Sequence, residues 1–418
     1  MNYKRFLGAA SAALMIIIAI LMLAPGAGAA SKYKTLYKFS GGKDGKFPQA
    51  SLIFDQAGNL YGTTAGGGAH QWGIVFQLVP NLDGSWKENV LHQFTGGNDG
   101  GEPLAGLIFD QAGNLYGTTT QGGTCVFKQG CGVVFKLTPK GDGTWTESVI
   151  HSFKYTDGAT PTAGVVFDPA GNLYGTTSGG GAHEGAGTVF KLAHNPDGSW
   201  TESVLHNFCS RTNCSDGVGP AAGLVFDSVG NLYGTTGKVF KLTPNPDGSW
   251  TESVLHSFCS RTNCGDGELP EGSLIFDQAG NLYGTTLLGG VLNQGTVFKL
   301  TPNADGRWTE RVLHSFCTNC VDGERPLAGL IFDPAGNLYG TTFAGGDQGC
   351  FSGNGCGVVF KLTPNSKGGW NERVLHTFAD HPGANPEAGL IFDPAGNLYG
   401  TSIGDGSGTF GSVFEITP

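Results

Sequence analysis

The chain has 418 residues, a formal net charge of −10, 14% charged residues and 11% aromatic residues. Disordered chains are poor in aromatic residues and rich in charge, so this composition excludes disorder. The acidic balance argues against nucleic acid and anionic membranes as partners. The 72 glycines follow no collagen period and fit many short strands joined by tight turns.

Residues 1–30 differ in kind from the rest of the chain. They begin with two basic residues, continue with the apolar run Leu7–Leu23 and end on the small residues 27–29. This pattern predicts a secretory signal peptide, and it places the mature chain, residues 31–418, in the medium, the periplasm or at the cell surface. The alternative is an uncleaved anchor, because the apolar run is almost long enough to span a membrane. After cleavage no membrane association is expected.

Internal repetition dominates the sequence after residue 31. The segment Leu52–Thr64 recurs in seven copies spaced by 50 to 60 residues. A second motif, first present at Val75–Leu78, also occurs seven times, and a third, first present at Trp86–Phe94, occurs six times. Self-similarity at a fixed period of this length is typical of repeat architectures such as propellers.

Each repeat reads as four short strands bounded by turn residues. In the first copy, strand a covers 52–55, strand b 59–64, strand c 75–78 and strand d 86–94. Asp-x-Ala-Gly-Asn between a and b, and Asn-Pro-Asp-Gly-Ser between c and d, are typical of tight hairpins. Four antiparallel strands per repeat predict an all-β fold, a seven-bladed β-propeller over residues 31–418. We expect it to be a monomer.

The two ends of the mature chain predict how the ring closes. Thr35–Phe39 aligns with strand d, with Tyr37 where the other copies carry His, and the chain stops at Pro418 directly after the seventh strand c. The last blade therefore lacks a strand d that the N-terminal segment can supply. Pairing of the two would remove two exposed sheet edges.

Residues repeated in every blade are expected to serve the scaffold. The aspartates of strand a are interpreted as turn caps, although a ring of carboxylates could also hold a cation. Strand d is expected to be outermost with its glutamate exposed, its histidines structural and its tryptophans packed between blades. The residues concerned are Asp55, Asp110, Asp168, Asp227, Asp277, Asp333 and Asp393; His92, His151, His206, His256, His314 and His376; and Trp86, Trp145, Trp200, Trp250, Trp308 and Trp370.

The ten cysteines fall into five close pairs, all in loops. An even number in an exported chain predicts disulfides. A zinc or redox site is the alternative, with Cys317-Thr-Asn-Cys320 as its best candidate. The expected pairs are Cys125 with Cys131, Cys209 with Cys214, Cys259 with Cys264, Cys317 with Cys320, and Cys350 with Cys356.

Variation between the repeats predicts where a ligand binds. In a four-stranded antiparallel blade the b–c and d–a loops lie on one rim, and these loops hold all the cysteines and most of the length variation. The b–c loop of the fourth repeat shrinks to 236–238, which would leave a notch. The alternative is that these are ordinary surface loops. The candidate binding residues are His70, Trp72, Phe127, Lys128, His183, Glu184, Asp347 and Phe351.

The three repeated motifs resemble the GloVer-type tandem repeat of exported bacterial proteins. The resemblance covers residues 31–418 and implies no particular activity. Because this chain ends on its last strand, we expect release rather than surface anchoring. More weakly, Asp-x-x-Gly-Asn-Leu-Tyr is similar to the turn of NHL and SMP-30-like propellers, some of which are metal-dependent lactonases.

The sequence contains no G-x-S-x-G, H-E-x-x-H or P-loop motif, so it predicts no catalytic residue, no metal ligand and no cofactor. We expect a non-enzymatic scaffold that binds a glycan, peptide or protein through its disulfide-bearing loops. The alternative is a hydrolase or lactonase of the SMP-30-like type with a divalent cation in the central channel.

Overall fold

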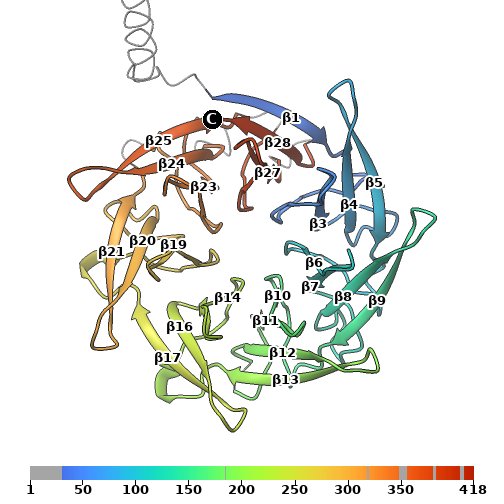
Figure 1. Ribbon diagram of the computed structural model, residues 1–418, viewed down its shortest axis with the longest axis horizontal. Helices are drawn as coiled ribbons and strands as arrows, with labels where there is room; N and C mark the ends of the chain where they lie inside the picture. The colour runs from blue at the N-terminus through green and yellow to red at the C-terminus, as the bar shows by residue number, and fades with distance from the viewer. Residues whose placement is uncertain (1–30, 184, 318–319, 348–354, 380–382, 405–408) are drawn as a thin grey trace, which may run out of the picture.

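A computed structural model describes residues 31–183, 185–317, 320–347, 355–379, 383–404 and 409–418. The predicted signal peptide, Glu184, Cys350 and Phe351 lie outside the described residues. Seven four-stranded antiparallel sheets surround a central axis like the blades of a propeller (Figure 1). The predicted fold class is therefore confirmed.

Blades one to six each run a-b-c-d from the axis outward, and blade seven combines both chain ends. Innermost are β2 (Ile53–Phe54), β6 (Ile108–Phe109), β10 (Val166–Phe167), β14 (Val225–Phe226), β18 (Ile275–Phe276), β22 (Ile331–Phe332) and β26 (Ile391–Phe392). Next are β3 (Leu60–Thr64), β7 (Leu115–Thr119), β11 (Leu173–Thr177), β15 (Leu232–Thr235), β19 (Leu282–Thr286), β23 (Leu338–Thr342) and β27 (Leu398–Ser402). Strand a is only two residues long, shorter than the motif suggested.

The two outer positions complete each blade. Third are β4 (Ile74–Pro80), β8 (Val133–Pro139), β12 (Thr188–His194), β16 (Lys238–Pro244), β20 (Thr296–Pro302), β24 (Val358–Pro364) and β28 (Ser412–Thr417). Outermost are β5 (Trp86–Gln93), β9 (Trp145–Ser152), β13 (Trp200–Asn207), β17 (Trp250–Ser257), β21 (Trp308–Ser315) and β25 (Trp370–Thr377), with β1 (Lys32–Lys38) in this place in blade seven. Short 3-10 turns η1 (Thr212–Cys214) and η2 (Thr262–Cys264) lie in two d–a loops.

The repeated aspartate caps the a–b turn, as the sequence predicts. In blade one, Oδ1 of Asp55 accepts hydrogen bonds from the backbone N–H groups of Ala57 and Asn59, each at 2.9 Å. Oδ2 accepts the side-chain amide of Asn59 at 2.7 Å and the hydroxyl of Tyr61 at 3.0 Å. Gly58 takes a φ of +83°, which costs little without a side chain. All four acceptor positions of the carboxylate are thus occupied.

The core of each blade depends on a glycine of strand b facing a phenylalanine of strand c. Phe76 is fully buried, and a Cβ atom built on Gly62 would lie 2.6 Å from its Cζ. Any larger residue at Gly62 would displace the ring from the centre of the blade. This contact explains why every copy of the motif reads Leu-Tyr-Gly-Thr.

Neighbouring blades are joined by the tyrosine of strand b. The ring of Tyr174 in blade three packs edge-on against Phe226 of blade four, with 5.1 Å between ring centroids, and lies 6.2 Å from the ring of Trp250. The same clusters contain the tryptophans of the other five complete strands d. The tryptophans therefore pack between blades, as predicted.

The N-terminal strand closes the ring. β1 pairs antiparallel with β28, and Tyr37 lies opposite Val413 at the position that histidine occupies in the other blades (Figure 1). Leu36 and Phe39 are buried against blade one, while Tyr33 stacks on His376 of blade six at a centroid distance of 4.0 Å. One short strand thus binds three blades together.

No helix among the described residues is long and apolar enough to cross a membrane.

Removing residues 31–39 from the mature chain should destabilise the whole ring. The deletion exposes the edge of β28 and empties the sites of Leu36 and Phe39, so we expect the free energy of unfolding to fall by about 5 kcal/mol or more. Urea unfolding and light scattering measure the effect. A synthetic peptide of residues 31–42 should restore stability, and Lys34→Ala, at an exposed position of the same strand, should change little. An unchanged unfolding midpoint after the deletion would contradict ring closure by β1.

Candidate ligand-binding face

The b–c and d–a loops lie together on one rim of the disc, which we call the stapled rim. Among the described residues it carries four disulfides. These join Cys125 to Cys131 in a b–c loop, and Cys209 to Cys214, Cys259 to Cys264 and Cys317 to Cys320 in d–a loops. The a–b and c–d turns form the opposite rim, which we call the hairpin rim.

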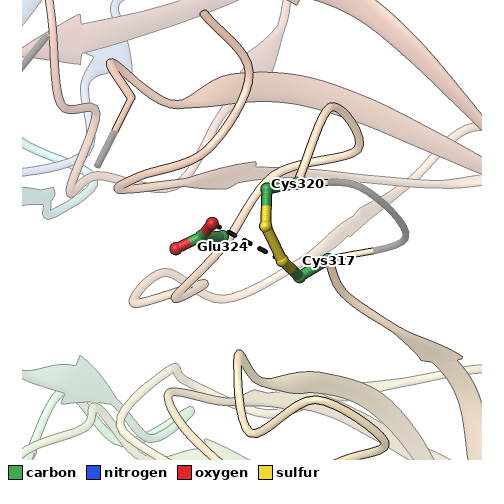
Figure 2. A group of neighbouring side chains, drawn as sticks. All are labelled: Cys317, Cys320 and Glu324. Atoms are coloured by element: carbon green, nitrogen blue, oxygen red, sulfur yellow. Dashed lines mark hydrogen bonds between the residues drawn. A yellow bond between two sulfur atoms is a disulfide. The ribbon is translucent and has the colours of Figure 1, made fainter. Parts of the chain in front are cut away.

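The group that most resembles a metal site is Cys317, Cys320 and Glu324, whose ligand atoms lie within 4.8 Å of one another (Figure 2). Sγ of Cys317 lies 3.5 Å from Oε1 of Glu324, and burial raises the pKa of Glu324. Zinc binds the thiolate form of cysteine, but here the two sulfur atoms are bonded to each other. The oxidised loop therefore offers no thiolate ligand.

Two of the stapled d–a loops clamp one blade to the next. Nη2 of Arg211, inside the Cys209–Cys214 loop, lies 2.8 Å from Oε2 of Glu252 on β17, whose side chain is 1% exposed. Arg261 in the Cys259–Cys264 loop makes the same pair with Glu310 on β21. The shorter Cys317–Cys320 loop has no arginine. These two disulfides therefore hold an inter-blade ion pair in place.

The strand-d glutamates are not exposed, and that expectation is wrong. Glu252 and Glu310 are buried, and the others are half-buried, because each one faces the d–a loop of the preceding blade. Burial, and then the charge of Asp99, raises the pKa of Glu147 to about 7. Asp99 in turn lies 3.5 Å from Nε2 of His92, so a His-Asp-Glu group lies across this seam. Five of the six strand-d histidines lie 3.1 to 3.5 Å from an aspartate of the following d–a loop, and His376 stacks on Tyr33, contacts that fit the structural role expected of them.

Exposed apolar side chains gather on the stapled rim. Of the eleven large hydrophobic residues that are exposed in the described part of the chain, eight lie in b–c or d–a loops. Exposed apolar side chains indicate a binding surface where they lie side by side, as Phe127 and Tyr155 do here. The eight are Val126, Phe127, Tyr155, Val218, Leu269, Val291, Leu292 and Val321.

A pocket of about 550 Å³ opens on this rim between blades two and three. The ring of Phe127, 51% exposed, lies 5.0 Å from the ring of Tyr155, and Lys128 lies at the same mouth. The Cys125–Cys131 disulfide fixes the loop that carries Phe127. An aromatic pair beside a cationic side chain on a fixed loop is a suitable docking point for a ligand.

The other predicted binding residues that the structure describes, His70, Trp72, His183 and Asp347, do not line this pocket. Trp72 packs over the glycines of the following d–a loop, where a Cβ atom at Gly96 would lie 2.4 Å from its ring. His70, His183 and Asp347 are exposed on blades one, three and six. Only Phe127 and Lys128 of the predicted set therefore share a described pocket.

The central channel has a polar mouth on the stapled rim, in a cavity of about 320 Å³. The residue that follows the proline before strand a is polar in four blades: Gln49, Thr162, Glu271 and Glu387. Nε2 of Gln49 donates to Oε2 of Glu387 at 2.7 Å, and burial raises the pKa of both glutamates. These four side chains hold six oxygen atoms, but Oε2 of Glu387 already accepts from Gln49, so fewer than the six that a hard cation prefers are free.

Sequence reasoning missed Tyr155, the arginine clamps and the channel glutamates. Tyr155 lies in a d–a loop, and pairing its ring with Phe127 required coordinates. The two glutamates could have been found from the sequence, because Leu104, Ala221 and Leu327 are apolar at the equivalent positions of three other repeats.

Comparison with known proteins identifies one repeat family. The model of the Gloeobacter/Verrucomicrobia repeat matches residues 22–238 and 235–418. No curated protein matches the chain.

Two solved structures are similar to the chain. One is described as an oxidoreductase (glucose dehydrogenase) from Thermus thermophilus, with 16% identity, 93% of this chain and 100% of that chain covered, and a TM-score of 0.43. The other is the extracellular domain of a protein described as a one-component system of B. thetaiotaomicron, with 13% identity, a TM-score of 0.50, and 92% of this chain but 42% of that chain covered. At such identities the likeness concerns the fold alone.

Arg211→Ala should destabilise the seam between blades three and four. It leaves Glu252 buried without its counter-charge, so we expect a loss of about 2 kcal/mol in the free energy of unfolding. Adding Glu252→Gln should recover part of the loss. Arg307→Ala removes an arginine that is 84% exposed and paired to Asp305, and it should have almost no effect. Equal losses for Arg211→Ala and Arg307→Ala in urea unfolding would refute the clamp.

Glu147→Gln should change how stability depends on pH. The glutamate has a pKa of about 7 when folded and an ordinary value of 4.5, so the folded state loses stability as pH rises from about 4.5 to 7. The variant lacks this loss, and we expect it to be about 1 kcal/mol more stable than the wild type at pH 8 and equal at pH 4, allowing for solvent screening. Melting curves at the two pH values measure this difference. The exposed neighbour substitution Ser148→Ala should show no such dependence; a pH-independent Glu147→Gln effect would count against the assignment.

Proposed function

The chain belongs to the Gloeobacter/Verrucomicrobia repeat family, and for this member we propose an exported propeller that binds a polypeptide partner without transforming it. The stapled rim is the binding face, and the Phe127–Tyr155 pocket is its anchor. Residues 1–30 direct export as a signal peptide, and the disulfides fit an oxidising compartment.

The single observation that carries this proposal is the concentration of exposed apolar side chains on the stapled rim. A polypeptide can cover several separated apolar side chains at once, because its own side chains project at regular intervals. Phe127 and Tyr155 provide the aromatic contact that often dominates the binding energy at interfaces, and Lys128 favours an acidic or carbonyl-rich segment.

The hydrolase alternative is favoured by one observation, the pair of channel glutamates with raised pKa values. Glu387 already accepts a hydrogen bond from Gln49, and three of the seven equivalent positions carry Leu104, Ala221 and Leu327. Binding is therefore the better supported function.

Selection of a displayed peptide library on the mature protein tests the proposal. We expect enriched peptides to bind the wild type and to lose about 30-fold in affinity on Phe127→Ala or Tyr155→Ala, because both remove a partly exposed aromatic contact. The matched control is Leu82→Ser, which replaces a fully exposed residue on the hairpin rim and should leave the affinity unchanged.

Repeating the binding measurement with a chelator distinguishes peptide binding from the cation-dependent hydrolase alternative. Peptide affinity should be the same with and without EDTA, and Glu387→Gln should not weaken it. Failure to enrich any peptide, or equal binding by the Phe127→Ala and Leu82→Ser variants, would overturn the proposal. Loss of binding in EDTA would instead support a cation-dependent site.

A further inference from the structure

The hairpin rim carries a second kind of pocket, repeated between blades. Two of these inter-blade grooves form cavities lined by a tyrosine and a tryptophan, of about 860 Å³ between blades three and four and 680 Å³ between blades seven and one. A third cavity, of about 540 Å³, lies between the a–b turns of blades two and three. They lie at the a–b and c–d turns, away from the disulfides and the exposed apolar loops. Their position makes them independent of the binding face proposed above.

The groove between blades three and four is lined by aromatic side chains and one lysine. Trp250 and Phe226, both half-buried, line it together with Tyr174, which is 4% exposed. Nζ of Lys191 lies 5.5 Å from the centre of the Tyr174 ring, within cation–π distance. Flat aromatic surfaces and one ammonium group therefore face the same space.

The carboxylates of this groove are already occupied. Asp168 accepts hydrogen bonds from the backbone N–H groups of Ala170 and Asn172, from the side-chain amide of Asn172, and from the hydroxyl of Tyr174. Burial alone would raise the pKa of Asp168, but these hydrogen bonds hold it below its ordinary value. Because all four acceptor positions are used, the groove has little capacity left to accept from a ligand, whereas Lys191 can still donate.

We propose that these grooves bind sugar rings of an acidic glycan, with the uronate carboxylate on the lysine. The C–H face of a pyranose ring is flat and apolar enough to pack on the half-buried tryptophan of each groove, while the tyrosine is buried and holds the lysine in place. A carboxylate supplies the acceptors that the lysine ammonium needs, and it meets no unoccupied carboxylate of the protein.

Four grooves contain the complete set of tyrosine, lysine and tryptophan, each with the lysine Nζ 5.4 to 5.7 Å from the tyrosine ring. Several weak sites on one face bind a polymer tightly, because each engaged site raises the effective concentration at the next. The sets are Tyr116, Lys136 and Trp200; Tyr174, Lys191 and Trp250; Tyr233, Lys241 and Trp308; and Tyr283, Lys299 and Trp370.

The other three grooves lack one part each and serve as internal controls. Gln77 replaces the lysine between blades one and two, and Glu415 replaces it between blades seven and one. Between blades six and seven the lysine is Lys361, but β1 supplies no tryptophan. Nζ of Lys361 lies 5.0 Å from the centre of the Tyr339 ring and 3.9 Å from Oδ2 of Asp333. These three are expected to bind an acidic sugar poorly.

Calorimetric titration of the mature protein with short uronate oligomers tests the proposal. The probes are trimers of galacturonate, mannuronate and glucuronate, with the methyl ester of each and triglutamate as controls. We expect at least one acidic trimer to bind at four sites per chain, which matches the complete grooves. The methyl ester should bind about tenfold more weakly, because the charged hydrogen bond to lysine is lost.

Single substitutions should change the number of sites rather than the fold. Lys191→Gln should lower it from four to three, Gln77→Lys should raise it to five, and Lys361→Gln, in a groove without tryptophan, should leave it unchanged. Circular dichroism checks that each variant is folded.

Three results would overturn the proposal. The first is that no acidic trimer binds, and the second is one site per chain that survives Lys191→Gln. The third is equal binding of triglutamate, which would mean that the grooves recognise only the negative charge and not the sugar ring. Phe127→Ala should leave uronate binding intact, so failure here does not affect the peptide-binding proposal.

Discussion

The propeller depends on one contact that recurs at every seam: the tyrosine of strand b lies on the phenylalanine of the next blade. The ring centroids are 5.0 to 5.2 Å apart at all seven seams, and each hydroxyl donates to the turn aspartate of its own blade. A tyrosine therefore fixes a turn within one blade and the angle to the next. Because the angle is the same each time, the ring closes after a set number of blades, and the N-terminal strand is needed to complete the last one.

The same contact divides the molecule into a constant face and a variable face. The turn, the tyrosine and the tryptophan all lie toward the hairpin rim, so loops on that rim cannot vary without disturbing a seam. The opposite rim has its own ring contacts across the seams, such as Phe94 against Phe135 at 5.1 Å, but the loops outside these contacts accept insertions and disulfides. Where a stapled loop does support a seam, it does so with a charge, as Arg211 does with Glu252. This difference explains why the repeats agree on one rim and disagree on the other.

The fold could be predicted from the sequence because the same residues form the strands, the turns and the packing contacts in every repeat. Ring closure was predictable for the same reason, since Thr35–Phe39 matches the strand-d motif but precedes the first strand a, and the last blade lacks a strand d. The site was less predictable. Phe127 and Lys128 were identified from an irregular loop, but Tyr155 lies in the next d–a loop and only the folded ring brings it to the pocket. The buried glutamates were misjudged because alternation along strand d suggests exposure, whereas the neighbouring blade's loop covers that side.

Repetition itself is the reason that conserved-looking scaffold residues can also form a binding surface. A tryptophan that only sealed a seam would gain most by full burial, yet Trp250 stays half-exposed beside Lys191 and an open cavity. The lysine is equally unnecessary for the fold, because blade one replaces it with Gln77 and blade seven with Glu415 while keeping the same strand pairing. This lysine lies beside a half-buried tryptophan in four consecutive seams, and a ligand that itself repeats explains the arrangement better than packing does. A glycan is a polymer of repeated sugar units and can offer the same group to several grooves, whereas a single globular partner cannot.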